Sequence, residues 1–394
     1  MEIERSYEKM LSEKVKLSVG VVGIGFAGSY NAQKVFNSLN VPAFVINSST
    51  KDLSDGVIDA NIPSFIIGQD GRGAGNDRMK AKEAFKFNGR KLLEDNPVFV
   101  KLASETDILF VVFSSSGGTG SGSGPDFVKV CRKIYPQKQI IPIVIAPKHT
   151  DSSLAQYNNL ECINELDVLE GPYIIADLDR YATDNDDVAY EKISEWVVET
   201  VRKIGGMEMN MTQSGMMDEN DLQNVISAKG YLTQYTINVS AKSLEKEDIQ
   251  DILIKRINES PAMMIQKDRH VSWAGLIVNL PQDINDPIRS GDLSKLLAVI
   301  GEPKHVYKNY SVSNSTNGTV TIILSGLSLP YNRLSECTAK IEEYMKATKD
   351  SQRNISLAND ISKLSGSDIS FGGFTSANKP VQSDASQALD DFFD

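Results

Sequence analysis

The sequence predicts an α/β protein with a doubly wound parallel sheet, a long central helix, a smaller α+β second domain and a flexible C-terminal tail. Three observations predict this fold class. Six apolar runs rich in β-branched residues alternate with helical patterns over the first half of the chain, which is typical of parallel strands buried on both faces. Glycine-rich loops directly follow two of these runs. The last part of the chain is rich in serine and has no long apolar run.

The 394 residues exceed what one compact domain usually holds, so we divide the chain into segments. The buried-strand pattern gives way to mixed patterns near residue 206, and apolar runs end near residue 348. The expected segments are an N-terminal arm (1–14), an α/β domain (15–186), a central helix (187–206), a loop with a second α+β domain (207–347) and a flexible tail (348–394).

The elements follow in chain order. The strand runs are KLSVGVVGI, PAFVIN, IPSFII, DILFVVF, QIIPIVIA and PYIIA, and residues 76–96 and 153–169 have the spacing of crossover helices. From 187 to 204 apolar residues recur every three or four positions, which predicts a long helix whose buried face holds Ala189, Ile193, Val197, Val201 and Ile204. The second domain has the strand candidates YLTQYTINVS, VSWAGLIVNL and TVTIILSGLSL, with helices at about 245–258 and 331–347.

Composition excludes several classes of protein. With 41% hydrophobic and 24% charged residues the chain is near the globular average, and the absence of an 18-residue apolar run predicts a cytoplasmic protein without membrane span or leader. The net charge of -11 opposes direct binding to nucleic acid or to an anionic membrane. The odd, scattered cysteines Cys131, Cys162 and Cys337 are expected to be buried thiols. The histidines, which lack ligand spacing and are expected to be structural, are His149, His270 and His305.

The first strand run leads into GIGFAG, with Gly23, Gly25 and Gly28 in GxGxxG spacing at the start of a helix. Free backbone N–H groups and the helix dipole can hold phosphate there. One interpretation is a Rossmann NAD-dependent oxidoreductase, which would place an acid at the end of the second strand to bind the ribose. That strand ends in Asn47 instead, which weakens this interpretation.

A stronger signal follows the fourth strand run, where residues 114–125 read SSSGGTGSGSGP and lead into a helix. Such a stretch lets the backbone approach a ligand closely and offers N–H and hydroxyl donors to phosphates. No lysine completes a P-loop. A third glycine loop at 71–76 can close over the terminal phosphate, so the loops at this edge of the sheet predict one large anionic ligand and make 15–186 a nucleotide-binding domain.

The stretch SGGTGSGSGP resembles the tubulin signature GGGTGSG, with Ser116 where the family often has glycine. The order of motifs over residues 15–330 is similar to the tubulin and FtsZ superfamily, nearest in style to the TubZ and PhuZ group of plasmid and phage tubulins. The resemblance implies binding of GTP or GDP with Mg²⁺, the metal ligands being unassigned. It implies that the nucleotide loops comprise Gly23, Gly25, Phe26, Ala27, Gly28, Asn31, Asn47, Gly73, Ala74, Gly75, Asn76, Ser114, Ser116, Gly117, Gly118, Thr119, Gly120 and Ser121.

The same resemblance suggests contacts to ribose and base. Glu161 resembles the family glutamate that reaches the ribose, although it is equally well a solvated helix charge. Tyr181 and Asn185 resemble the aromatic residue that stacks on guanine and the asparagine that hydrogen-bonds its edge. Leu178 stands where an asparagine is usual, so Asp177 or Asp179 is a possible substitute. Arg72 and Arg78 can steady the terminal phosphate or be merely solvated.

The segment MMDENDLQNVI is similar to the family pattern that serves hydrolysis, with Met216 in place of an asparagine. Asp218 and Asp221 lie three residues apart, so on the first turn of a helix both carboxylates can orient water; the alternative is a helix cap with a first-turn acid. A helix of about 18 residues spans about 27 Å, which places these acids too far from a nucleotide at its other end. They are expected to serve another subunit, and repeating that contact gives a head-to-tail filament.

The sequence thus predicts a polymerising cytoskeletal GTPase that positions plasmid or phage DNA. The alternatives are an FtsZ-like division GTPase, a tubulin homologue that does not hydrolyse GTP, and the oxidoreductase. The terminal LDDFFD, in which Asp390, Asp391 and Asp394 surround Phe392 and Phe393, is either a docking peptide for an adaptor or a solvated tail.

Overall fold

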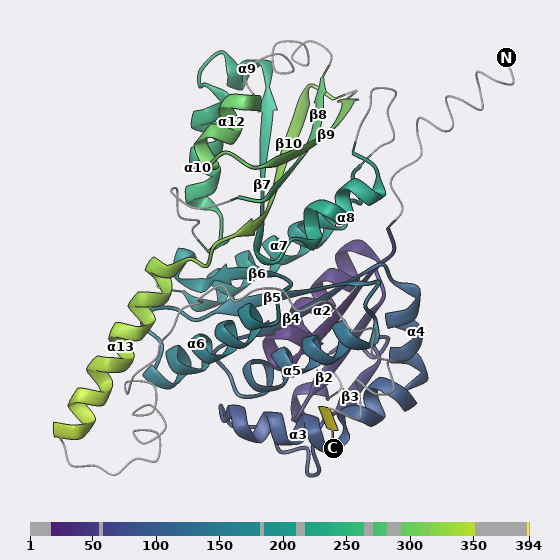
Figure 1. The fold of residues 1–394 in the computed structure, drawn as a ribbon, viewed down its shortest axis with the longest axis vertical. Coiled ribbons are helices and arrows are strands. Elements are labelled where there is room, and N and C mark those ends of the chain that lie inside the picture. The colour runs from purple at the N-terminus through teal and green to yellow at the C-terminus, as the bar shows by residue number, and fades with distance from the viewer. Residues whose placement is uncertain are drawn as a thin grey trace, which may run out of the picture.

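The computed structural model describes residues 17–54, 58–181, 185–209, 217–263, 271–281, 293–313, 315–350 and 392–393. Within these residues the strands form one ten-stranded sheet in the order β3-β2-β1-β4-β5-β6-β7-β10-β8-β9 (Figure 1). The predicted α/β fold class is confirmed. The N-terminal arm lies outside the described residues, as do residues 351–391 and 394 of the tail, His270 and Met216. Residues 348–350, which were expected to belong to the tail, instead continue the helix α13 (Tyr331–Asp350).

Six parallel strands form the half of the sheet that the apolar runs predicted. Their backbones are buried by helices on both faces, which is why the sequence shows continuous apolar runs and no alternation. The exception is the short edge strand β3, whose Ser64 is exposed. The strands are β1 (Val19–Ile24), β2 (Ala43–Asn47), β3 (Ser64–Ile66), β4 (Ile108–Ser114), β5 (Gln139–Ala146) and β6 (Pro172–Asp177).

Helices cover this half on both faces. α2 and α7 contribute Val35 and Val197 to the core on one face, while α3, α4 and α5 contribute Phe85, Phe99 and Phe127 to the core on the other. The crossover helix expected at 76–96 is observed as α3 with a π-helical continuation. The bounds are α2 (Gly25–Leu39), α3 (Arg78–Arg90), η2 (Lys91–Asp95), α4 (Pro97–Glu105), α5 (Thr119–Ile134), α6 (Ser153–Val168) and α7 (Asp186–Ile204), with 3-10 turns η1 (Lys51–Leu53) and η3 (Leu178–Tyr181).

α7 runs from the carboxyl ends of the parallel strands to their amino ends. Near its start, Lys148 from the loop after β5 pairs with Asp186, so this end lies beside the carboxyl ends of the parallel strands. At its far end a Cβ on Gly205 would lie 3.0 Å from the Val19 side chain, at the beginning of β1. The buried face predicted from the spacing is observed, since Ala189, Ile193, Val197, Val201 and Ile204 are all buried.

The remaining strands join the same sheet through a short parallel pairing of β6 with β7 at Pro172↔Gly230. β7, β10 and β8 are antiparallel, and β9 pairs with β8 in parallel. β9 was not expected, because at this edge position the polar Asn309 and Ser311 are buried while Val312 is exposed, which hides the strand pattern. The bounds are α8 (Glu219–Ser227), β7 (Gly230–Ser240), α9 (Ala241–Leu244), α10 (Ile249–Glu259), β8 (Trp273–Pro281), α12 (Leu293–Ile300), β9 (His305–Ser313), β10 (Asn317–Leu327) and α13 (Tyr331–Asp350).

α13 is anchored to the parallel-stranded half of the sheet by a buried ion pair. The Arg333 guanidinium lies 2.9 Å from the Asp177 carboxylate at the end of β6 and also donates to the carbonyl of Pro147. The Asp177 side chain is only 3% exposed, so this pair replaces solvent around a buried charge. Burial raises the pKa of Asp177, and Arg333 opposes that rise.

All three cysteines are buried and free, as expected. His149 contacts Asp179, and His305 stacks on Trp273. In the part of the chain that the structure describes, no helix combines the length and apolar character needed to cross a membrane.

Candidate functional site

A hollow of about 450 Å³ lies at the carboxyl ends of β1, β4 and β5. Three predicted glycine loops meet there, which is the arrangement expected for one ligand at the edge of a parallel sheet. The lining residues are Ile24, Gly25, Phe26, Ala27, Ser49, Asp52, Arg72, Gly73, Ala74, Gly75, Asn76, Ser114, Ser116, Gly117, Gly118, Thr119, Gly120, Ile145 and Tyr190.

Two helix N-termini face this hollow. α2 begins at Gly25, whose φ of 75° favours glycine, and α5 begins at Thr119. Neither helix has a side-chain cap or an acidic residue in its first turn. Their backbone N–H groups and the positive ends of their dipoles are therefore available to an anionic ligand.

The loops around the hollow hold one another in place. The hydroxyls of Ser48 and Thr119 are 2.7 Å apart, which connects the loop after β2 to the start of α5. The Asn158 amide donates to the carbonyls of Asn76 and Ser116, which ties the β3–α3 loop to the loop after β4. A Cβ on Gly118 would lie 2.8 Å from the backbone N of Asp77, so only glycine permits this contact.

Several predicted residues support the hollow from behind its lining. A Cβ on Gly23 would lie 2.4 Å from the Gly28 carbonyl oxygen, and one on Gly28 would lie 2.2 Å from that of Val112, so both glycines allow α2 to pack closely on the sheet. Asn31 donates to the Ala27 carbonyl, and Asn47 donates to Asp52. Ser121 donates to the carbonyl of Gly117.

Glu161 does not reach the hollow. It lies on α6 and lines a separate hollow of about 410 Å³ between α5 and α6, where its carboxylate is 3.8 Å from Arg78. Burial raises the pKa of Glu161, with Arg78 opposing the rise. This placement departs from the expected ribose contact because the charge faces α3 and not the nucleotide loops.

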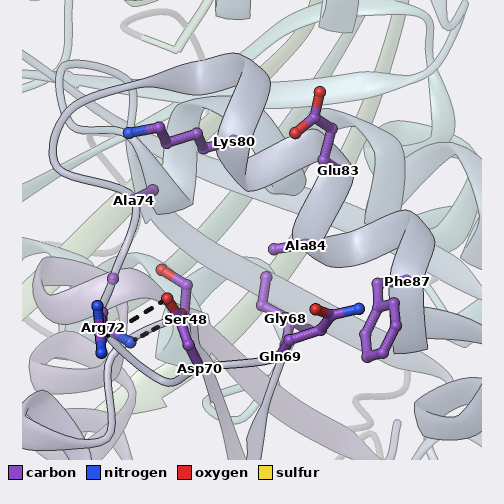
Figure 2. A pocket seen from close by; sticks show the side chains of 12 residues that line it. Ser48, Gly68, Gln69, Asp70, Arg72, Ala74, Lys80, Glu83, Ala84 and Phe87 are labelled. Atoms are coloured by element: carbon purple, nitrogen blue, oxygen red, sulfur yellow. Dashed lines mark hydrogen bonds and ion pairs between the residues drawn. The ribbon is translucent and has the colours of Figure 1, made fainter.

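Arg78 is also committed elsewhere. Its guanidinium donates to the Ser121 carbonyl and to Glu165, and the side chain is only 7% exposed. It therefore braces α3 against α5 and α6. Arg72 remains beside the hollow, 85% exposed and 3.9 Å from Asp70, at the border with a second hollow of about 560 Å³ that extends along α3 (Figure 2).

Tyr181 and Asn185 do not line the hollow either. The Tyr181 hydroxyl donates to the carbonyl of Glu259, and Lys192 lies over its ring. Asn185 caps α7 by accepting from the N–H of Asp187. The suggested substitutes Asp177 and Asp179 are engaged by Arg333 and His149, respectively.

Two aromatic residues line the hollow, the expected Phe26 on α2 and Tyr190 on the second turn of α7. Tyr190 was not expected from the sequence, nor were Ser49, Asp52 and Ile145. Its signal was an aromatic side chain on the outer face of an amphipathic helix, where it is 46% exposed.

Asp218 and Asp221 form a reciprocal capping box at the start of α8. The Asp218 carboxylate accepts from the N–H of Asp221 at 2.9 Å, and the Asp221 carboxylate accepts from the N–H of Asp218 at 3.2 Å. Both lie outside the hollow. α8 leads into Gly230 beside the beginning of β6, on the side of the amino ends of the parallel strands. The capping alternative is thus present in the structure, and it leaves each acid a second carboxylate oxygen.

The fold and hollow define an α/β nucleotide-binding protein with glycine loops in place of a P-loop. Residues 5–177 match the model of the Tubulin/FtsZ family, GTPase domain. The chain carries this Tubulin/FtsZ-family GTPase domain, which confirms the expected family and enzyme class and removes the oxidoreductase alternative.

Similar proteins include Tubulin-like protein TubZ of Clostridium botulinum C phage, 24% identical over 331 residues covering 83% of this chain and 80% of the relative. Tubulin-like protein CetZ of Pyrococcus furiosus is 26% identical over 271 residues, covering 65% of this chain and 70% of the relative. Among solved structures, Clostridium botulinum phage c-st TubZ has a TM-score of 0.66 at 20% identity, covering 84% of this chain and 99% of its own. The GTPgS-bound protofilament of CetZ2 from Haloferax volcanii has a TM-score of 0.67 at 16% identity, covering 83% and 99%.

Proposed function

We propose that this protein is a cytoplasmic GTPase that binds GTP in the hollow, assembles head to tail and hydrolyses GTP between subunits. The observation that carries the proposal is the path of α7. Its first turns lie beside the hollow, and its end lies at the amino ends of the parallel strands, where α8 also leads into β7. Nucleotide and acids are therefore exposed on opposite ends of one subunit.

The loops after β1, β3 and β4 hold the phosphates. Their backbone N–H groups and the two uncapped helix N-termini supply positive potential without a lysine. Tyr190 packs on the guanine from the side of α7, the contact we first expected from Tyr181. Neighbours bound to GDP and to GTPgS support the choice of nucleotide.

The donor set suits Mg²⁺, which commonly keeps water and phosphate ligands and takes one or two carboxylates from the protein. Asp52 supplies a carboxylate in the lining, held by the Asn47 amide at 3.3 Å. Among the described residues there is no group of three His, Cys, Asp or Glu side chains that would hold a metal by itself. When bound there with GTP, the ion would neutralise phosphate charge.

Asp218 and Asp221 act on the nucleotide of the next subunit. Their capping box fixes both carboxylates on one turn, and the second oxygen of each can orient a water and accept its proton. One surface carrying nucleotide and the opposite one carrying acids make a heterologous contact, which repeats into an open filament. Protofilaments of CetZ2 and of Bacillus thuringiensis TubZ support this assembly.

For the biological role we propose plasmid or phage DNA positioning, supported by the similarity to a phage TubZ. An adaptor protein would connect the filament to DNA, because the net charge of -11 opposes direct binding. An FtsZ-like division role is the alternative, supported by a shorter match of 137 residues to a Pyrococcus woesei FtsZ.

The test is GTP turnover per molecule as a function of protein concentration. It should be low in dilute protein and rise above a threshold, while nucleotide bound per molecule stays constant. A specific rate that is constant from dilute monomer upward would refute hydrolysis between subunits.

A further inference from the structure

The last residues that the structure describes pack onto the GTPase domain. Phe392 and Phe393 lie against Phe85 of α3, with ring centroids 6.0 and 5.7 Å from its ring. The Lys129 ammonium of α5 lies 5.6 Å from the centre of the Phe392 ring. Figure 1 shows this chain end beside α3, although 41 residues (351–391) separate it from the end of α13.

The receiving surface fits two aromatic rings. Gly89 leaves the space, because a Cβ there would lie 2.8 Å from the Phe85 ring and 3.2 Å from the Phe393 ring. Phe85 in turn contacts Phe127 of α5, with ring centroids 6.2 Å apart, so the terminal pair extends an aromatic cluster of the core. Edge-to-face contacts of this kind stabilise beyond the apolar area they bury.

The charges of the two partners are complementary. Three aspartates, Asp390, Asp391 and Asp394, flank the phenylalanines in the sequence. Lys129 of α5 lies over the Phe392 ring, and Lys86 directly follows Phe85 on α3. Two other cations of α3 are already paired within the domain, Lys82 with Asp126 and Glu165 and Arg90 with Glu94. An aromatic seat with Lys129 beside it suits an acidic peptide with two phenylalanines.

We infer that the surface of α3 and α5 around Phe85, Gly89 and Lys129, the aromatic seat, is a binding site for an acidic diphenylalanine peptide, and that its occupant is the C-terminus of the same molecule. The intervening 41 residues can span up to about 140 Å when fully extended, so the tip can reach its own domain. The site is distinct from the nucleotide hollow, because Phe85, Gly89 and Lys129 do not line that hollow. The inference does not depend on GTP hydrolysis or on filaments.

The test is hydrogen exchange of the full chain with GDP, comparing wild type with the double variant Phe392→Ser/Phe393→Ser. Amides in the second half of α3 and in α5 around Lys129 should exchange about fivefold faster in the variant, because local opening becomes easier when the cluster loses its cover. The matched control is Phe371→Ser/Phe374→Ser, which removes two phenylalanines from the same tail and should leave exchange at the wild-type rate. Lys129→Glu should also speed exchange in α3, whereas Lys133→Glu, one turn further on α5, should not.

Three outcomes would overturn the inference. Unchanged exchange in the double variant would mean that the aromatic seat does not hold the tip. An equal effect of the control variant would mean that tail composition alone matters. Protection that disappears on about tenfold dilution would assign the aromatic seat to the tail of a second copy, since binding within one molecule is independent of concentration.

Discussion

The carboxyl ends and the amino ends of the parallel strands present different chemical groups. At the carboxyl ends, the groups that line the hollow are largely backbone N–H groups of glycine loops and of two uncapped helices. On the side of the amino ends, the candidate groups are the carboxylates of Asp218 and Asp221, each of which already accepts a hydrogen bond from the other residue's backbone. The hollow is formed within one chain, whereas the two carboxylates are satisfied locally and, in the proposed function, gain a further role when a neighbouring subunit brings a phosphate to them.

That difference predicts that GTP binding and GTP hydrolysis can be disabled separately, provided that the fold between the two sites stays intact. The pair Arg333–Asp177 belongs to this part of the fold, because it lies at the carboxyl end of β6 but does not line the hollow. Arg333→Met leaves a buried carboxylate without its counter-charge and should lower the free energy of unfolding by about 3–5 kcal/mol. The measurement is chemical denaturation, with Glu336→Gln as a control, because Glu336 is the exposed partner of Arg333 and its loss should have little effect.

The pH dependence of this loss has a definite sign. Burial already raises the pKa of Asp177, and removing Arg333 raises it further. A raised folded-state pKa disfavours the folded state when the group is ionised, so the deficit should be greatest at about pH 7 and shrink toward about pH 5 as Asp177 becomes protonated. A deficit that grows on acidification would refute the buried-charge account.

Removing the charge of either acid should slow GTP hydrolysis without weakening GTP binding. Asp218→Asn and Asp221→Asn keep good capping chemistry but remove a negative charge, so GTP binding should be unchanged while hydrolysis slows by about 10². Filaments should then form and persist. Phosphate release and filament lifetime measured together decide this, with Glu219→Gln as the neighbouring control; wild-type rates in both aspartate variants would leave the capping box as the acids' whole role.

The smallest expected effect distinguishes two tyrosines. Tyr190→Leu should weaken GTP binding about fivefold, because an aromatic contact contributes about 1 kcal/mol. Tyr181→Leu should leave GTP affinity unchanged, since its hydroxyl bonds the Glu259 carbonyl away from the hollow. Fluorescent GTP titration measures both, and the reverse ranking would restore Tyr181 to the site.

The glycine loops could be predicted because a backbone that must approach phosphate closely restricts composition over many consecutive positions. Gly118 illustrates this, as any side chain there would meet Asp77. Single side chains carried no such constraint. Glu161 and Tyr181 were plausible by position, yet where they point depends on how α6 faces α3 and on where α10 ends, both of which are tertiary contacts. Tyr190 was missed for the same reason.

The seat of Phe392 and Phe393 on α3 has a consequence for any partner that recognises the same tip. A tethered ligand is present at its own site at an effective concentration that does not fall when the protein is diluted. An adaptor requiring these phenylalanines binds only molecules whose tip has left the aromatic seat, so its apparent dissociation constant is the intrinsic one divided by the undocked fraction. Such an adaptor would respond to whatever shifts α3, even with the tail sequence and both concentrations held constant.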